Sequence, residues 1–276
     1  MTESSTIEEA FAGAGLNRHG YAYLPKPGPP TPLRSFVGVD TILTVAVDDE
    51  GRRRNLIEQR AREWASGHGI DTPAVLDASP TGSWLLGQRI AAGEPAGPGY
   101  VHAALDAADQ IAAADPPVLP VAASRWRASR RSRLGRLIRA LRGRLDLARF
   151  IQLRRQVGGL DDLTTSHGDF YRRNVLALGD RVSVVDWEFV GMAPRWTDQL
   201  RIWSTLLERE DRREAWDRIV AGAGDGRRHL TVLAQWLACR LVAENLAAPV
   251  AQQNSADLAH ARRVWAEARS LTAALR

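Results

Sequence analysis

Hydrophobic residues in the first ninety positions follow mainly the two-residue period of β-strands. This pattern predicts five strands, over residues 20–24, 34–39, 41–47, 73–77 and 83–90. Two helices are predicted as well. Residues 5–15 have a cap residue, Ser5 or Thr6, with Glu8 and Glu9 in the first turn, and residues 52–66 repeat their apolar residues at helical spacing. A Pro-rich turn and Asp40 separate the first three strands, which we therefore expect to form a small antiparallel sheet.

Beyond the Pro- and Gly-rich segment AAGEPAGPG, the pattern is helical to the end of the sequence, with one exception. Apolar stripes predict helices over residues 100–114, 132–153, 197–207, 212–221, 227–246 and 255–275. The exception is a hairpin, with strands 175–178 and 181–185 around a Gly179-Asp180 turn. The pattern thus predicts a mixed N-terminal part and a mainly helical C-terminal part.

Three polar residues around this hairpin suit phosphoryl transfer. Asp169 could orient a hydroxyl nucleophile and accept its proton, while Asn174 and Asp186 offer the hard oxygen ligands that nucleotide-bound Mg²⁺ requires. Asn174 precedes the first strand of the hairpin and Asp186 follows the second, so both lie at the same end of it. A single Asp of this kind is more often a cap or a turn residue, but the set of three favours a catalytic site.

The segments HGDFYRRN and VVDWE resemble the catalytic and metal-binding loops of the aminoglycoside phosphotransferase and choline kinase family. The resemblance implies that Asp169 is the catalytic base, that Asn174 and Asp186 hold Mg²⁺, and that His167 supports the loop. GMAPRWTDQL resembles the next segment of the family, in which the aspartate, here Asp198, is structural.

The resemblance also implies a two-lobed, protein-kinase-like α/β fold. A small, mainly β N-lobe would span residues 1–90 and carry the nucleotide, and a larger, mainly helical C-lobe would span residues 91–276. LLGQRI resembles the segment that joins the lobes, which predicts a hinge near residues 88–93, with the Gln88 carbonyl and the Ile90 amide against the nucleotide base. The sequence contains no GxxxxGK[ST] motif, so a P-loop enzyme is excluded.

The nucleotide site departs from the family in one position. Family members carry a lysine on the third strand, which contacts the phosphates and pairs with a helix glutamate; here Glu58 takes the glutamate position, but Thr44 stands in place of the lysine. A substitute cation could be Lys26, in the turn between the first two strands, or an arginine, either Arg34 or one of residues 52–54. A third reading is a catalytically silent protein that binds nucleotide weakly.

Composition indicates a soluble globular protein. Of 276 residues, 45% are hydrophobic and 25% charged, which excludes disorder throughout. The single cysteine, Cys239, excludes an intramolecular disulfide and a Cys-based zinc site. The N-terminal residues do not resemble a signal peptide, and no apolar run is long enough for a transmembrane segment, so we expect a cytoplasmic protein.

The net charge of +5 comes from one segment. Arg125 to Arg155 contains twelve arginines and one acid, an excess of eleven positive charges, so the remainder of the chain carries −6. An apolar stripe within this segment predicts a helix whose arginines face water or an anionic partner. A solvated helix face is the simpler interpretation, and binding to a nucleic acid or a membrane surface is the alternative.

Together these observations predict Mg²⁺-dependent transfer of the γ-phosphate of ATP or GTP to a hydroxyl group of a small molecule. By resemblance the acceptor is an antibiotic or a similar natural product, with a metabolite or sugar as the alternative. A silent nucleotide-binding protein, motivated by Thr44, and a nucleic-acid or membrane-surface binder are the competing functions.

Overall fold

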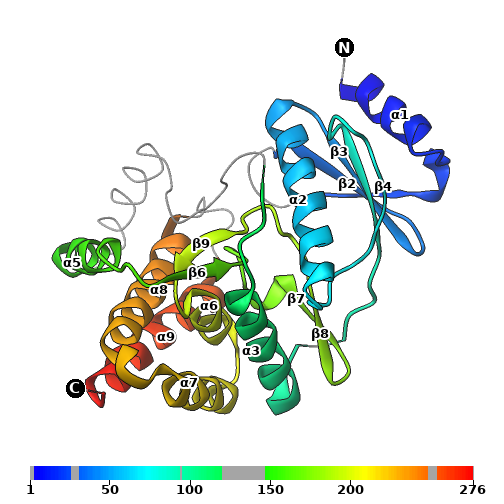
Figure 1. Ribbon diagram of the computed structural model, residues 1–276. Coiled ribbons are helices and arrows are strands. Elements are labelled where there is room, and N and C mark those ends of the chain that lie inside the picture. Colours follow the sequence, from blue (N-terminus) through cyan, green and yellow to red (C-terminus); the bar gives the residue numbers. More distant parts are fainter. Residues whose placement is uncertain (1–2, 26–30, 94, 120–146, 248–253, 276) are drawn as a thin grey trace.

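The computed structural model describes residues 3–25, 31–93, 95–119, 147–247 and 254–275, and it has the two-part architecture that the sequence predicts (Figure 1). A five-stranded sheet with two helices forms the N-terminal part, and the C-terminal part is mainly helical. The predicted mixed α/β architecture is thereby confirmed.

The N-terminal sheet is antiparallel throughout, in the order β1-β2-β3-β5-β4. Its strands are β1 Ala22–Leu24, β2 Leu33–Val37, β3 Thr41–Ala46, β4 Val75–Ala78 and β5 Trp84–Gln88. All five predicted strands are present, with ends that differ by a few residues.

Each face of this sheet is covered by a different helix. Leu43 and Val45 of β3 are fully buried in one apolar cluster with Phe36 of β2 and Phe11 of α1 (Glu3–Gly13), so α1 covers what we call the outer face. α2 (Asp49–Gly67) packs on the other face, here called the inner face, where the Asn55 side chain donates to the carbonyl oxygen of Thr44. Side chains alternate between the faces along a strand, so Thr44 belongs to the inner face.

Helix α2 begins three residues before the predicted start. The Asp48 side chain caps the helix by accepting a hydrogen bond from the Gly51 amide at 2.7 Å, and Asp49 and Glu50 occupy the first turn, where the helix dipole favours acids. The apolar stripe starts only at Leu56, so periodicity alone placed the start of the helix too late.

The C-terminal part packs six described helices around two short sheets. The helices are α3 Gly97–Ala113, α5 Leu147–Gly158, α6 Thr197–Thr205, α7 Arg209–Ala223, α8 Arg227–Ala247 and α9 Ser255–Ala273. The predicted helix over residues 132–153 falls largely outside the described residues, as does most of the arginine-rich segment. No helix in the described part of the chain has the length and apolar character needed to span a membrane.

The predicted hairpin is confirmed as β7 (Val175–Leu178) and β8 (Arg181–Val184). A second small sheet, β6 (Leu163–Ser166) with β9 (Gly191–Pro194), was not predicted. Strands of four residues that contain threonine, serine, glycine and proline do not show the alternating apolar pattern. This sheet matters for the site because the HGD motif follows β6 directly.

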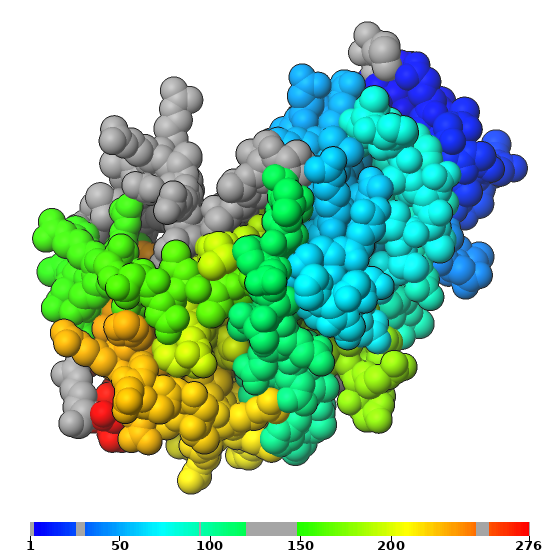
Figure 2. Space-filling view, in the orientation of Figure 1, coloured from blue at the N-terminus to red at the C-terminus, as the bar shows by residue number. Residues whose placement is uncertain are grey.

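The two parts of the chain contact each other beside the hairpin. In the space-filling view the blue and cyan N-terminal residues lie against green α3 and the yellow-green hairpin (Figure 2). The segment after α2 is hydrogen-bonded to β8, from the Val184 amide to the Asp71 carbonyl at 2.8 Å and from the Thr72 hydroxyl to the Val184 carbonyl at 2.9 Å. The segment after β5 reaches the same hairpin, where the Gly93 amide donates to the Ala177 carbonyl at 2.9 Å.

Candidate active site

The loop that follows β6 has a backbone shape that depends on Gly168. This residue has a φ of 82°, and a Cβ added to it would overlap the carbonyl oxygen of Phe189. Glycine is the residue that adopts a positive φ without steric cost, and here the missing side chain also allows close approach of another segment. The loop is therefore held against the chain that follows β8.

His167 joins this loop to the end of β8. Its side chain is fully buried, its Nδ1 accepts from the Asp169 amide at 3.3 Å, and its Nε2 donates to the Val185 carbonyl at 3.0 Å. The ring also packs edge-on against Trp187, with centroids 4.6 Å apart. Both ring nitrogens are used by the backbone, so the geometry suits the supporting role that the resemblance implies and not proton transfer.

Asp198 fixes the start of the same loop. Its Oδ1 accepts from the Ser166 hydroxyl at 2.8 Å and its Oδ2 accepts from the His167 amide at 2.6 Å, and all three residues are buried. A carboxylate that accepts a backbone N–H makes a strong, charge-assisted bond. Asp198 thus stabilises the loop from the first turn of α6.

Asp169 and Asn174 lie in direct contact. The Asn174 Nδ2 donates to the Asp169 carbonyl oxygen at 2.9 Å and to its Oδ2 at 3.4 Å, and both side chains are buried. Arg173, largely exposed, reaches the same Oδ2 at 3.4 Å. This use of Nδ2 leaves the Asn174 side-chain oxygen as an acceptor for a ligand.

Asp186 is brought beside Asn174 by the hairpin. The Val185 amide donates to the Asn174 carbonyl at 2.9 Å, so the next residue, Asp186, leaves the hairpin at the same end. Asp186 has a φ of 68°, a left-handed conformation that aspartate tolerates better than most residues. Its carboxylate forms no hydrogen bond or ion pair with the described residues.

The donor set fits Mg²⁺ bound to a nucleotide. Mg²⁺ takes oxygen ligands and is usually held by one or two protein side chains, with substrate phosphates and water completing the shell. The Asp186 carboxylate and the Asn174 side-chain oxygen supply that number. No group of three or more His, Cys, Asp and Glu residues suited to a metal occurs within the described ranges, so a site formed by protein alone is not found there.

The candidate cations for the nucleotide occupy different places. Arg34 pairs in register with Val45 and therefore lies on the outer face, where it contacts Glu3 of α1 at 2.6 Å. Arg54 contacts both Glu50, at 2.9 Å, and Glu188, at 3.1 Å. Lys26 lies outside the described residues. The structure therefore does not bring Arg34 to the inner face with Thr44.

Glu58 lies on α2 toward the inner face and is buried. Its Oε1 accepts from Arg62 at 2.7 Å, one helical turn further along, and its Oε2 has no hydrogen-bond partner. The sequence reasoning did not single out Arg62, although its spacing of four residues from Glu58 is the usual one for a helical ion pair.

The predicted hinge follows β5. The Gln88 amide donates to the Ala74 carbonyl at 2.9 Å, and the Arg89 amide donates to the Asp40 carbonyl at 2.8 Å. The Ile90 amide forms no backbone hydrogen bond within the described part of the chain. That amide is therefore available, while the contact of Gln88 and Ile90 with a base remains a prediction.

A charged cluster that the sequence did not reveal surrounds Tyr171, two residues after Asp169. The Tyr171 ring lies near Arg173 and Arg201, with guanidinium carbons 5.6 and 5.4 Å from its centroid. Arg240 of α8 is paired with Glu244 at 2.6 Å, and that carboxylate raises the pKa of Arg240. Burial raises the pKa of Tyr171 above its ordinary value. No sequence motif marks these residues as neighbours.

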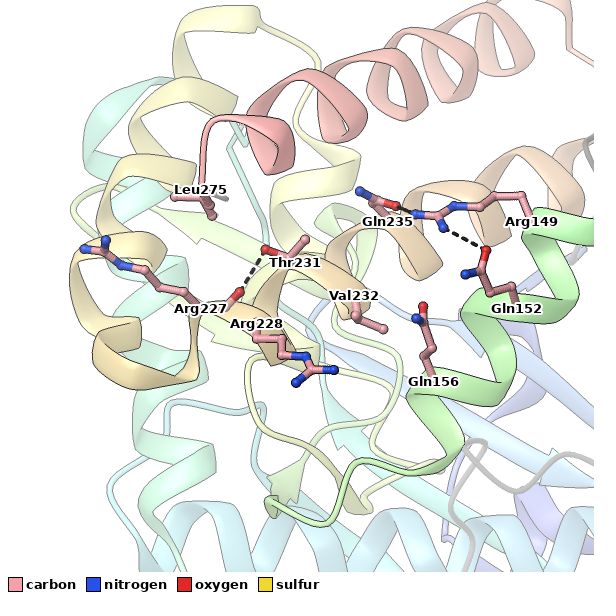
Figure 3. Close-up of a pocket in the computed structure, with 9 residues that line it drawn as sticks. All are labelled: Arg149, Gln152, Gln156, Arg227, Arg228, Thr231, Val232, Gln235 and Leu275. Carbon is pink, nitrogen blue, oxygen red and sulfur yellow. Dashed lines mark hydrogen bonds between the residues drawn. The ribbon is translucent and has the colours of Figure 1, made fainter.

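A cavity of about 550 Å³ lies elsewhere, between α5, α8 and Leu275, which follows α9 (Figure 3). Arg149 bridges Gln152 of α5 and Gln235 of α8, and Arg227 and Arg228 lie at the beginning of α8. None of the candidate catalytic, metal or nucleotide residues lines this cavity. It is therefore not the site formed by the HGD loop and the hairpin.

The sequence profile of the phosphotransferase enzyme family, APH, matches residues 32–236. No curated protein matches the chain in sequence.

Several solved structures share its fold. The amicoumacin kinase in complex with AMP-PNP, Ca²⁺ and Ami has a TM-score of 0.65 and 13% identity, covering 99% of this chain and 97% of that one. A choline/ethanolamine kinase family protein from Mesorhizobium loti has a TM-score of 0.59 and 19% identity, covering 96% and 94%. The ADP-bound aminoglycoside phosphotransferase APH(2'')-Ib has a TM-score of 0.58 and 12% identity, covering 97% and 99%. At these identities the likeness shows the fold.

Proposed function

The chain belongs to the phosphotransferase enzyme family, and from this membership and its site geometry we propose that it transfers the γ-phosphate of ATP or GTP to a hydroxyl group of a small molecule. One observation carries the proposal. Asp169 touches Asn174, and the Asn174 carbonyl accepts from the amide of Val185, the residue before Asp186, so the proposed base and the two proposed oxygen ligands lie at one end of one hairpin. Phosphoryl transfer depends mainly on such positioning and on electrostatic stabilisation.

In this proposal Asp169 orients the acceptor hydroxyl and accepts its proton. Its loop is held by His167 and Asp198, and the Asn174 side chain holds the backbone of Asp169 itself. A positioned base of this kind contributes roughly 10²- to 10⁴-fold to a rate. Asn174 and Asp186 would hold Mg²⁺, which when bound neutralises charge on the phosphate oxygens.

The acceptor is proposed to be an antibiotic or a similar natural product. The names of similarly folded proteins support this class, since they include an amicoumacin kinase, a macrolide 2'-phosphotransferase and aminoglycoside phosphotransferases. Three arginines and one further carboxylate, Glu244, surround Tyr171 beside Asp169. This balance favours a neutral or weakly charged acceptor over a polycation, because like charges repel at short range. A metabolite or sugar with a free hydroxyl is the alternative acceptor.

The test is release of ADP or GDP in the presence of Mg²⁺ and a panel of hydroxyl compounds that includes macrolides, aminoglycosides, sugars and choline. We expect turnover with at least one neutral or weakly charged acceptor and a product heavier by one phosphate in mass spectrometry. Nucleotide binding without phosphorylation of any compound would contradict the proposed reaction.

A silent nucleotide-binding protein is the second candidate, because Thr44 cannot supply the cation that stabilises phosphate charge. It predicts thermal stabilisation by ATP with Mg²⁺ and no turnover over the same panel. A cytoplasmic location, where ATP and GTP are available, remains part of the main proposal. Binding of a nucleic acid or a membrane surface depends on a segment that lies mostly outside the described residues.

A further inference from the structure

The inner face of the N-terminal sheet lacks the expected lysine but holds another cation. Thr44 pairs with Leu85 and Ile42 pairs with Gly87, and paired residues of neighbouring strands share a face. The outer face is occupied by the cluster that contains Leu43 and Val45. The inner face of β3 and β5 therefore presents only neutral residues of its own, and a charge there has to come from α2.

Glu58 supplies the anchor for such a charge. Its side chain is 12% exposed, one oxygen accepts from Arg62 at 2.7 Å, and the other oxygen is buried without a partner. A buried carboxylate requires a compensating cation and further hydrogen bonds, because desolvation penalises an unpaired charge. Arg62 provides the cation, and the unused oxygen leaves the pair one hydrogen bond short.

Gly87 shows where the Arg62 side chain lies. A Cβ at this position would come within 2.7 Å of the Arg62 Nη1, and Gly87 does not have a positive φ. Glycine at this position therefore leaves room for the guanidinium against the strand, and its backbone conformation does not call for glycine. Arg62 therefore lies against the inner face of β5, beside Gly87. Gly87 is the residue before Gln88 at the predicted hinge.

Each of the other described candidates is paired with a carboxylate. Arg52 contacts Asp49 at 3.5 Å, and Arg53 contacts Glu50 at 2.8 Å. Arg54 is shared by two carboxylates, Glu50 and Glu188, and Arg34 is on the outer face with Glu3. Arg62 has one carboxylate partner, bound through Nε, and its two terminal nitrogens form no hydrogen bond with the described residues. A guanidinium whose two terminal nitrogens have no hydrogen-bond partner is well suited to bind phosphate oxygens.

From these contacts we infer that Arg62, oriented by Glu58, contacts the phosphate groups of the donor nucleotide and takes the place of a lysine on β3. The inference rests on the proposed function, because it assigns a residue to the donor site of that reaction. It explains how a chain with Thr44 retains a cation beside Glu58, which phosphoryl transfer in kinases requires.

The experiment measures equilibrium binding of Mg·ATP and of adenosine to the full chain, without any acceptor. Arg62→Ala should weaken Mg·ATP binding about tenfold or more, the equivalent of one charge-assisted hydrogen bond, and leave adenosine binding within about twofold. Arg60→Ala is the matched control, since Arg60 is on the same helix but exposed, and it should bind both ligands as the wild type does.

A rescue distinguishes a phosphate contact from a structural role. Adding Thr44→Lys to Arg62→Ala places a cation on the inner face next to Glu58, and it should restore most of the lost Mg·ATP affinity. Unchanged Mg·ATP binding in Arg62→Ala, or an equal loss for ATP and adenosine, would overturn the inference. A protein that binds Mg·ATP through Arg62 but phosphorylates nothing would contradict the proposed function and leave this inference standing.

Discussion

Single backbone positions determine whether the candidate site can form. Gly168 and Asp186 both have left-handed φ angles, 82° and 68°, in the two segments that meet at the site. At Gly168 the conformation is combined with close approach of Phe189, while at Asp186 the side chain remains free to bind a ligand. The residue type is therefore constrained by backbone conformation at both positions, and also by close packing at Gly168 and by the proposed ligand at Asp186.

Gly168→Ala should destabilise the protein strongly. The left-handed conformation and the overlap with the Phe189 carbonyl together predict a loss of roughly 2 to 4 kcal/mol in the free energy of unfolding. Gly179→Ala is the control, because its φ is 68° and nothing lies within 4 Å of the added Cβ. Denaturant unfolding of both variants should show the smaller loss for Gly179→Ala, and equal losses would exclude the steric contribution.

Asp186→Asn should separate metal binding from folding. Asparagine also tolerates the left-handed conformation, so we expect an unfolding midpoint close to that of the wild type. The variant lacks the negative charge that attracts Mg²⁺, and ATP should no longer raise its melting temperature more in the presence of Mg²⁺ than with a chelator. An unchanged Mg²⁺-dependent shift would remove Asp186 from the metal site.

Among the candidate site residues, the structure brings together those that the sequence places in one short stretch. His167, Asp169, Asn174 and Asp186 are close in sequence and joined by a hairpin that its turn residues predict, so their proximity followed from local structure. Arg240 comes near Asp169, and Arg62 comes beside Gly87, only through the packing of α8 and α2, which no local pattern specifies. Arg34 was a candidate from its position in the sequence, but it lies on the outer face of the sheet. One residue of register decides which face of a strand a side chain occupies.

At the scale of elements, a buried histidine connects α9, which packs on α8, with α6. His260 donates from Nε2 to the Ser204 carbonyl at 3.1 Å, and its Nδ1 is buried without a partner. Burial lowers the pKa of His260 below its ordinary value of 6.5, and the nearby Arg212, Arg263 and Arg172 act in the same direction. The native state thus favours the neutral ring.

This shift predicts that stability decreases in mild acid. The unfolded chain binds a proton at His260 near pH 6.5 and the folded chain resists it, so the contribution of His260 is present above pH 6.5 and is lost as pH falls below that value. His260→Gln should show a shallower decline in unfolding free energy between pH 7.5 and 5.5. An identical pH dependence in wild type and variant would show that His260 does not cause the loss of stability in mild acid.

Periodicity predicted most elements because their apolar positions are regular. It found the five strands of the N-terminal sheet and the hairpin, and it placed α8 within one residue of its observed ends. It missed β6 and β9, which pair with each other but have no alternating apolar pattern. The start of α2 depends on a cap, Asp48, that lies before the apolar stripe.

In the whole molecule, the segment that carries Asp186 is tied to the N-terminal part. Trp187, next to Asp186, donates to the Thr72 hydroxyl at 3.1 Å and packs against Trp64, and Glu188 binds Arg54. These contacts connect α2, which carries the proposed phosphate-binding arginine, with the segment that carries Asp186. A ligand that bridges both should stabilise the molecule as one unit.

The Arg54 and Glu188 pair should contribute modestly to this connection. Its side chains are 28% and 13% exposed, so solvent weakens the attraction and we expect a coupling of about 0.5 to 1 kcal/mol. A double-mutant cycle with Arg54→Met and Glu188→Gln, measured by denaturant unfolding, gives this value. A coupling of zero would mean that the ion pair does not help to hold the two parts together.

The most direct test of the account is the turnover number of Asp169→Asn, measured with saturating Mg·ATP and a confirmed acceptor. The substitution keeps the shape of a buried side chain and removes the proposed base. We predict a fall of roughly 10²- to 10⁴-fold in kcat, with Mg·ATP affinity within about twofold of wild type. Wild-type turnover in this variant would show that Asp169 is not the base and that the site does not work as proposed.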